Sequence, residues 1–142
     1  MYQVNLFRLF SLILAMLLAA PQLLLAEEEK EGEKTTEPLA IHYYQIKPSL
    51  VANLASGGRY IRCDIQLMTR DKAFVDDLRL HDAAIRHTLL LLLSDQDGNK
   101  IKSTIGKEAL RKQALSQINK LLKEQSGKDG VEALFFTTFF VQ

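Results

Sequence analysis

Residues 59–70 read Arg-Tyr-Ile-Arg-Cys-Asp-Ile-Gln-Leu-Met-Thr-Arg, and they contain the clearest structural pattern of the sequence. Apolar and polar side chains alternate along it with a period of two residues. One set is entirely apolar and comprises Ile61, Cys63, Ile65 and Leu67. The intervening set comprises Arg62, Asp64 and Gln66. Because successive side chains of a β-strand point to opposite faces, the stretch predicts a long strand with one buried face and one face in water.

Two shorter extended segments precede this strand. Residues Ile41–Ile46 are rich in aromatic and β-branched side chains and predict a short strand that ends at Lys47-Pro48. Ser49–Leu54 is either a second strand or an extended continuation of the first. Ala55–Gly58 contains two glycines and a serine, which predicts a turn into the long strand.

Three helices are expected after the long strand, over Lys72–Leu80, Ala83–Ser94 and Ile105–Gln125. Each follows a residue that suits an N-cap, respectively Asp71, Asp82 and Thr104. The second helix contains the five consecutive leucines Leu89–Leu93, which predicts burial over most of its circumference. Residues 95–99 are expected to form a loop, and the sequence after them lacks the ligand pattern of an EF-hand. Gly127–Gly130 should end the third helix.

The chain closes with a strand over residues 131–141 that contains two pairs of phenylalanines. Adjacent phenylalanines place aromatic rings on both faces of a strand, so this strand is either central and covered twice or part of an interface. Strands, then three helices, then a strand indicate an α+β domain. We expect a small sheet of about three to four strands with three helices packed on it.

The N-terminal residues 4–26 are an apolar run with Arg8 near its start. As a helix they would span roughly 35 Å, which exceeds a hydrocarbon core of about 30 Å. Pro21 interrupts the run, and Ala26 fits the position before a cleavage site, whereas Leu24 is larger than signal peptidases prefer. Residues 1–26 are therefore expected to be an export signal or a single membrane anchor with its N-terminus in the cytoplasm.

An acidic segment follows at residues 27–38, with six glutamates and two lysines. It is too polar to bury a core and is expected to be a flexible spacer. Residues 39–142 are then expected to form one domain. They hold 15 basic and 11 acidic side chains, a mild net charge of +4 spread along the chain. No basic cluster with aromatic platforms occurs, so the sequence does not indicate a nucleic-acid partner.

The sequence contains no pattern typical of a catalytic or metal site. Cys63 is the only cysteine, so it forms no disulfide within the chain, and its place in the apolar set predicts a buried, inert thiol. The three histidines lack the spacing of metal ligands; they are His42, His81 and His87. The clustered carboxylates lie in polar surroundings rather than an apolar pocket; they are Asp76, Asp77, Asp95 and Asp97. We therefore expect that the protein is not an enzyme and that it binds neither a cofactor nor a metal ion.

An ordered set of four segments resembles the flagellar basal-body-associated protein family FliL. The first is residues 58–67, Gly-Arg-Tyr-Ile-Arg-Cys-Asp-Ile-Gln-Leu, and the second is residues 84–90, Ala-Ile-Arg-His-Thr-Leu-Leu. The third begins at Thr104 and includes residues 106–111, Gly-Lys-Glu-Ala-Leu-Arg. The last is residues 134–142, Leu-Phe-Phe-Thr-Thr-Phe-Phe-Val-Gln. The resemblance covers about residues 41–142.

The resemblance implies a non-enzymatic protein of the bacterial inner membrane, with one membrane helix and a periplasmic C-terminal domain. It implies a domain similar to the stomatin/prohibitin type that self-associates into oligomers or rings. It also implies association with basal-body components and with the stator proteins MotA and MotB, in support of flagellar rotation, chemotaxis and motility. An anchor over residues 4–26 would hold the chain in the inner membrane.

The final strand and the leucine-rich helix are the candidate surfaces for self-association or partner binding; their residues are Phe135, Phe136, Phe139, Phe140, Leu90 and Leu91. A charged replacement of Phe136 or Phe140 is expected to disturb such a surface without unfolding the domain. The alternative is a soluble periplasmic binding or scaffold module without a motor role, which cleavage near Ala26 would release.

Overall fold

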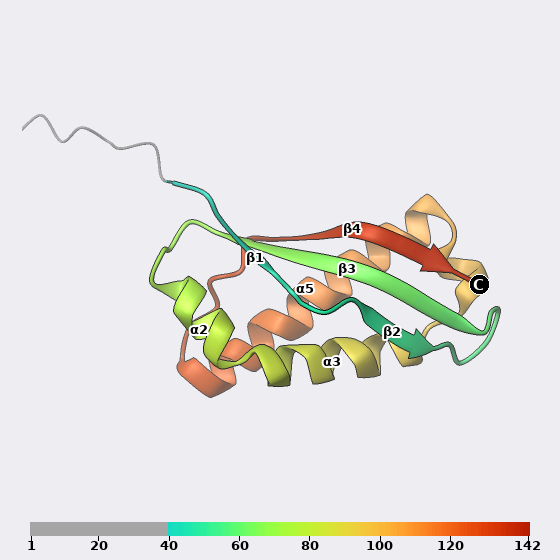
Figure 1. Cartoon of the computed structure of the whole chain (residues 1–142), viewed down its shortest axis with the longest axis horizontal. Helices are drawn as coiled ribbons and strands as arrows, with labels where there is room; N and C mark the ends of the chain where they lie inside the picture. The colour runs from blue at the N-terminus through green and yellow to red at the C-terminus, as the bar shows by residue number, and fades with distance from the viewer. Residues whose placement is uncertain (1–39) are drawn as a thin grey trace, which may run out of the picture. The chain divides into compact units, whose positions relative to one another are not determined.

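The computed structural model describes residues 40–142 (Figure 1). The residues expected to form the signal or anchor and the acidic spacer lie outside the described part. The elements follow the order β1, β2, β3, α2, α3, α4, α5 and β4. The strands are β1 (His42–Gln45), β2 (Leu50–Asn53), β3 (Tyr60–Thr69) and β4 (Ala133–Val141). The helices are α2 (Phe74–Leu80), α3 (Asp82–Ser94), α4 (Gly98–Ile101) and α5 (Thr104–Ser126).

Strand β3 is the centre of a four-stranded antiparallel sheet. On one side, β1 pairs with the C-terminal end of β3 and β2 pairs with its N-terminal end. On the other side, β4 pairs with nearly the whole length of β3. The segment that carries Lys47-Pro48 separates β1 from β2, so these two short strands act as one interrupted strand. The alternation along residues 59–70 thus correctly predicted the strand around which the sheet is built.

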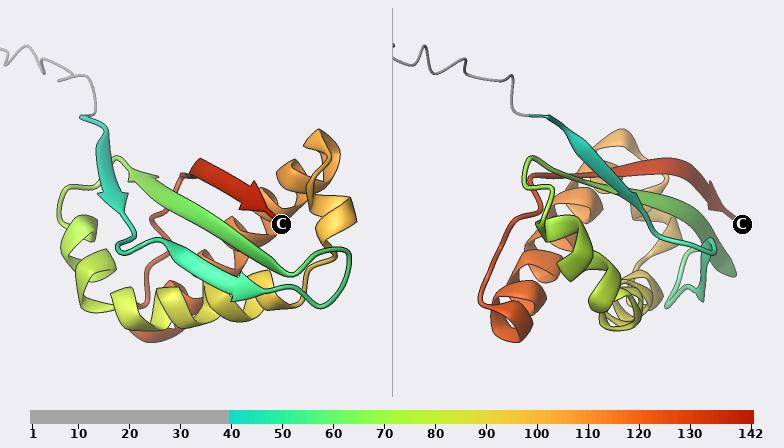
Figure 2. Two further views of the ribbon diagram at one scale, coloured as in Figure 1. Left: turned by 45° about the vertical axis from the view of Figure 1, so that its right-hand side comes forward. Right: turned by 60° about the vertical axis from the view of Figure 1, so that its left-hand side comes forward.

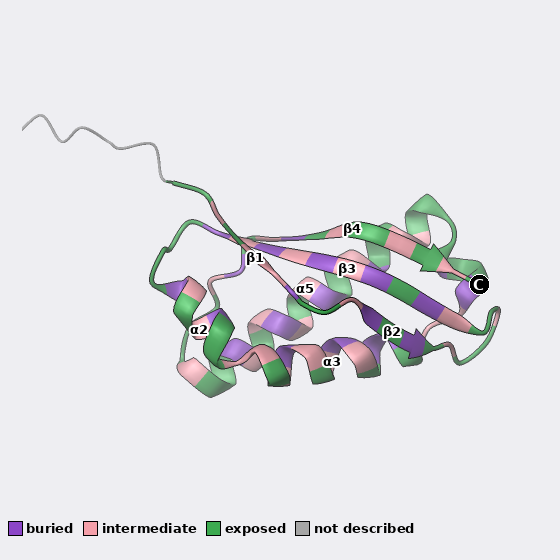
Figure 3. Ribbon diagram, in the orientation of Figure 1, coloured by how far each residue is buried: buried purple, intermediate pink, exposed green. Residues whose placement is uncertain are grey.

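The helices cover one face of the sheet, and the other face is open (Figure 2). Figure 3 shows the resulting alternation of buried and exposed residues along β3. The four apolar side chains of β3 that the pattern placed on one face are completely buried. They pack into one core with side chains of α2, α3 and α5, including Phe74, Leu89, Ile118 and Leu122. The predicted α+β class is confirmed.

The helix starts differ from the expected ones: the N-caps of α2 and α3 are Ala73 and His81, which make no side-chain cap hydrogen bond. Ser103, not Thr104, is the N-cap of α5, and its Oγ accepts a hydrogen bond from the N–H of Gly106 at 3.0 Å. Asp82 is the first residue of α3 and accepts a hydrogen bond from the Tyr44 hydroxyl at 2.9 Å. Asp71 forms a tight turn before α2 by accepting from the N–H of Ala73. The predicted end of α5 is confirmed, since Gly127 has a φ of 74°.

Two further expectations were wrong in detail. Part of the expected loop at residues 95–99 belongs to a fourth helix, α4, whose N-cap Asp97 accepts from the N–H of Asn99 at 2.8 Å. Helix α3 is not buried around most of its circumference, because Leu91 is 59% exposed while Leu89, Leu92 and Leu93 are buried. The helix rests on the core along one side only.

Strand β4 is also not a central strand. Within residues 40–142 it pairs only with β3, so its second edge has no neighbouring strand. The position on the far side of β3 is already taken by β1 and β2. The aromatic side chains on both faces of β4 therefore need another explanation than a strand covered twice.

Candidate interaction surface

A β-bulge decides which phenylalanines of β4 face the core. Ile65 pairs with Phe136 and Asp64 pairs with Thr138, so Thr137 is one residue more than the partner strand requires. The extra residue shifts the alternation of side chains along β4 by one position. Phe136 and Phe139, which are three residues apart, consequently lie on the same face.

Phe136 and Phe139 form a packed pair on the helix-covered face. Their ring centroids are 5.0 Å apart and the planes meet at 73°, an edge-to-face arrangement. Both pack against the core, opposite Ile65 and Cys63 of β3. The Nζ of Lys107 on α5 lies 4.7 Å from the centre of the Phe139 ring. These two phenylalanines hold α5 and β4 together, so a charge at Phe136 would disturb the fold itself.

Phe135 and Phe140 lie on the open face of the sheet, which we call the outer face. They are 41% and 50% exposed. Each lies beside a tyrosine: the rings of Tyr43 and Phe135 are 6.5 Å apart, and those of Tyr60 and Phe140 are 6.2 Å apart. The outer face therefore presents two aromatic pairs, one near each end of β3.

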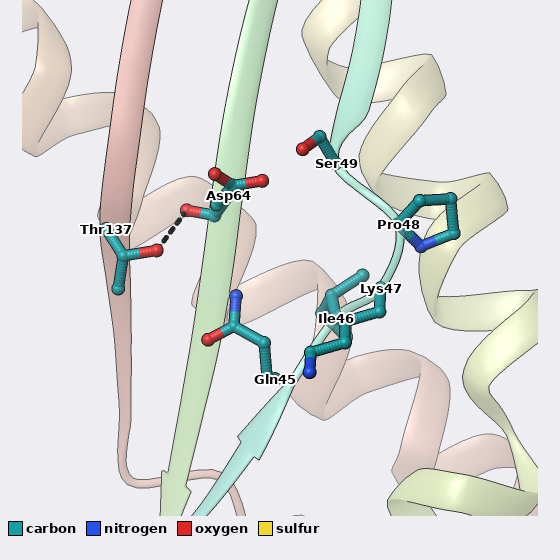
Figure 4. A pocket seen from close by; sticks show the side chains of 7 residues that line it. All are labelled: Gln45, Ile46, Lys47, Pro48, Ser49, Asp64 and Thr137. Atoms are coloured by element: carbon teal, nitrogen blue, oxygen red, sulfur yellow. Dashed lines mark hydrogen bonds between the residues drawn. The ribbon is translucent and has the colours of Figure 1, made fainter.

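A shallow depression of about 740 Å³ separates the two aromatic pairs (Figure 4). It lies where the chain passes from β1 to β2, beside the carboxylate of Asp64. The nearby hydroxyls of Ser49 and Thr138 hold the pKa of that carboxyl below its usual range. The Thr137 hydroxyl donates to the backbone oxygen of Asp64 at 3.3 Å. A carboxylate that stays ionised accepts hydrogen bonds from a docked donor, but it is unsuited to general acid catalysis.

The leucine candidates lie on α3, in the layer opposite the outer face. Leu90 is half-buried and packs against the core, whereas Leu91 points into solvent. The six predicted residues therefore do not form one surface. Phe135 and Phe140 share the outer face, Leu91 is exposed on the helical layer, and the other three are packed inside. Their role in association stays a prediction.

The thiol and the carboxylates that could take part in catalysis lie apart from one another. Cys63 is completely buried, and burial, followed by the negative charge of Asp64, raises the pKa of its thiol to about 12. Asp76 pairs with Arg79 at 2.7 Å, and Asp77 lies 3.4 Å from the Nζ of Lys128. Within residues 40–142, no three His, Cys, Asp or Glu side chains come together in a way that could hold a metal ion.

Sequence reasoning missed three residues of the outer face: Tyr43, Tyr60 and Asp64. The signal was present for both Tyr60 and Asp64. Asp64 belongs to the polar set of the alternating strand, and Tyr60 lies two residues before Arg62 of that set, so both point away from the core. Tyr43 could be placed only once β1 was known to pair with β3 in the register that sets Tyr43 opposite Met68.

Comparison with known proteins shows which family this domain resembles. The family model described as "Flagellar basal body-associated protein FliL" matches residues 43–142. The chain belongs to the FliL family. The "Flagellar protein FliL" of Aquifex aeolicus (strain VF5) is 28% identical over 114 residues, which cover 79% of this chain and 68% of that relative.

FliL proteins are flagellar basal-body-associated proteins, and the motifs that carry the resemblance have structural roles here. Gly106 lies so close to the backbone oxygen of Lys100 that a Cβ atom would collide with it. The side chain of Gln142 accepts from the Tyr60 hydroxyl at 2.8 Å, which joins the last residue to β3. Among residues 40–142, no helix has the length and apolar character needed to cross a membrane.

Proposed function

We propose that this member of the FliL family is a non-enzymatic adaptor of the flagellar motor. In this proposal the domain over residues 39–142 lies in the periplasm and binds stator units built from MotA and MotB. Residues 4–26 anchor it in the inner membrane. By organising stator units, the protein supports flagellar rotation and motility.

The outer face is the observation that carries the proposal. The aromatic pairs of Tyr43 with Phe135 and Tyr60 with Phe140 are exposed apolar groups on a rigid sheet, and the Asp64 carboxylate lies between them. Aromatic anchors around a hydrogen-bonding group are typical of protein-binding surfaces. An adaptor role needs such a surface rather than a reactive pocket.

The spacer gives this surface a limited reach. A segment of 12 residues extends at most about 40 Å, at roughly 3.3 Å per residue. An anchored domain would therefore search only the volume close to the membrane, where a stator partner is present at a high effective concentration.

The test measures swimming after charging the outer face. Tyr43→Lys and Phe140→Lys are introduced separately into a strain that lacks the native gene. Both side chains are exposed, so the free energy of unfolding should change by less than about 1 kcal/mol. We expect each variant to reduce the swimming halo in soft agar and the amount of MotB that co-purifies with the chain.

Leu80→Lys is the matched control, because Leu80 is also an exposed apolar residue, on α2 and outside the outer face. It should swim like the wild type. Leu91→Lys tests the helical candidate in the same way and is also expected to swim normally. Normal swimming and normal MotB recovery with both outer-face variants, at wild-type protein levels, would contradict the proposal. Normal swimming without the gene would favour the module without a motor role.

A further inference from the structure

The free edge of β4 carries backbone groups that need partners. In an antiparallel pair, alternate residues direct both N–H and C=O away from the neighbouring strand. The oxygen of Leu134 points away from β3, because it accepts from Nη1 of Arg111 at 3.4 Å. The backbone N–H and C=O of Phe136 also point away from β3. Because the bulge adds one residue, the next residues with this orientation are Phe139 and Val141. Four residues of β4 thus face the open edge with their backbone groups.

Apart from its bulge, this edge lacks the usual protection against strand pairing. Natural edge strands carry lysine or proline, are very short, contain a bulge, or are covered. Strand β4 has nine residues, and none is charged or proline. A long, uncharged edge of this kind is a template for another strand.

The sequence of β4 is symmetric about its centre. Residues 135–140 read Phe-Phe-Thr-Thr-Phe-Phe, flanked by Leu134 and Val141. We propose that β4 pairs antiparallel with β4 of a second copy, about a two-fold axis between Thr137 and Thr138. Phe135 then lies opposite Phe140 of the second copy, and Phe136 lies opposite Phe139 of the second copy. Cross-strand aromatic pairs of this kind stabilise sheets.

The bulge favours a second copy over any other strand. Two residues separate the edge-facing Phe136 from the edge-facing Phe139, where a regular strand has one. A regular partner would match the edge on one side of the bulge and be out of step on the other. A second copy in antiparallel orientation also has two residues at that point. On both sides of the axis, each edge-facing residue of one copy therefore lies opposite an edge-facing residue of the other, so their backbone N–H and C=O groups can form hydrogen bonds.

Space and charge at the edge agree with this pairing. A groove of about 270 Å³ lies beside Phe135 and Phe136, where α5 contributes Glu108 and Arg111. In the paired arrangement, Phe139 of the second copy lies opposite Phe136 at the mouth of this groove, and the Lys107 that lies over its ring lies beside it. The ammonium group of that lysine then approaches the Glu108 carboxylate. The contact is the same in both directions, so it produces a closed dimer.

Disulfide trapping tests the register directly. In the proposed pairing Phe135 and Phe140 of the second copy form a non-hydrogen-bonded pair, with Cα atoms about 4.5 Å apart. That separation suits a disulfide. The full-length chain with Phe135→Cys and Phe140→Cys is purified in mild detergent and oxidised. We expect about tenfold more covalent dimer than with Phe140→Cys alone, whose two copies lie five residues out of register.

A charge comparison provides the second measurement. Phe135→Lys with Phe140→Glu places opposite charges across the axis, whereas Phe135→Lys with Phe140→Lys places like charges there. Both remove the same two aromatic rings. The first should remain dimeric in analytical ultracentrifugation and the second should become monomeric. Equal association of both, or equal crosslinking of the single and double cysteine variants, would overturn the pairing. The inference rests on β4 alone, so a normal motility result with a trapped dimer would refute only the motor role.

Discussion

Cys63 illustrates how a single residue couples the fold to pH. Its thiol lies in the middle of β3, opposite Leu50 on one side and Phe139 on the other. Burial raises the pKa from its ordinary value of 9.0 to about 12, and the neighbouring Asp64 adds to the effect. The folded protein therefore keeps the proton at a pH where the unfolded chain has lost it.

The sign of the consequence follows from proton binding. Between pH 9 and pH 12 the unfolded state binds fewer protons than the folded state, so the free energy of unfolding falls as the pH rises. By pH 10 the loss from this thiol reaches about 1.4 kcal/mol. The free energy of unfolding is measured with urea at pH 8 and at pH 10. Between these two pH values, it should fall by about 1.4 kcal/mol less in Cys63→Ala than in the wild type. An identical loss in both proteins would show that the thiol ionises normally in the fold.

At the residue scale, side-chain direction could be predicted where the alternation was regular. Cys63 was correctly assigned to the core because it lies on the same face of the strand as three aliphatic residues, Ile61, Ile65 and Leu67. The caps were harder to predict, because Ser103 and Thr104 are both good N-cap residues next to each other. The choice depends on which hydroxyl meets the N–H of Gly106, and this geometry is set by the close approach of Gly106 to Lys100.

At the scale of elements, the bulge in β4 makes one residue of the strand dispensable. Deleting Thr137 would remove the extra residue and leave every other residue of β4 opposite its present partner. The core pair Phe136 and Phe139 would stay on its face. We expect the free energy of unfolding to change by no more than about 1 kcal/mol, measured by urea denaturation.

Deleting Phe135 is the matched control, because it also shortens β4 by one residue. To restore alternation, the strand would have to place Thr137 opposite Ile65, where Phe136 now packs. Loss of a buried phenylalanine contact costs about 3 kcal/mol or more. If the two deletions were equally destabilising, the bulge would not be the feature that sets the faces of β4.

The bulge could not be predicted from β4 alone. The two phenylalanine pairs correctly indicated aromatic rings on both faces, but the faces depend on how many residues of β3 lie opposite. That number appears only when Asp64 and Ile65 are paired with their partners. Helix α4 was missed for a related reason. It has four residues, too few for a helical period to be recognised.

At the scale of the whole molecule, the order of strands and helices was enough to predict the α+β class. The order of strands within the sheet was not, because it depends on which edge of β3 each segment occupies. The apolar character of β4 suggested either a central strand covered on both faces or part of an interface. In the structure the interrupted pair β1 and β2 takes one side of β3, which leaves β4 at the other edge.

The proposed motor role requires an intact chain in the membrane. We expect the mature protein to retain residues 4–26, measured by mass spectrometry of its N-terminal peptide, and to sediment with the inner membrane after cell breakage. Alkaline carbonate should fail to extract it, because an apolar segment of this length holds a protein in the bilayer. A mature N-terminus at Glu27, recovered in the soluble periplasm, would contradict the anchor and favour a free periplasmic module.

The pairing of β1 and β4 with β3 also has a mechanical consequence. The described chain enters β1 next to the end of β3 at Thr69, and Gln142 is bonded to Tyr60 at the opposite end. A force applied between Ile41 and Gln142 therefore acts along the strands. It loads the hydrogen bonds of each ladder in shear, so that they resist together instead of opening one after another. The sheet is oriented to transmit tension between its two ends without unravelling.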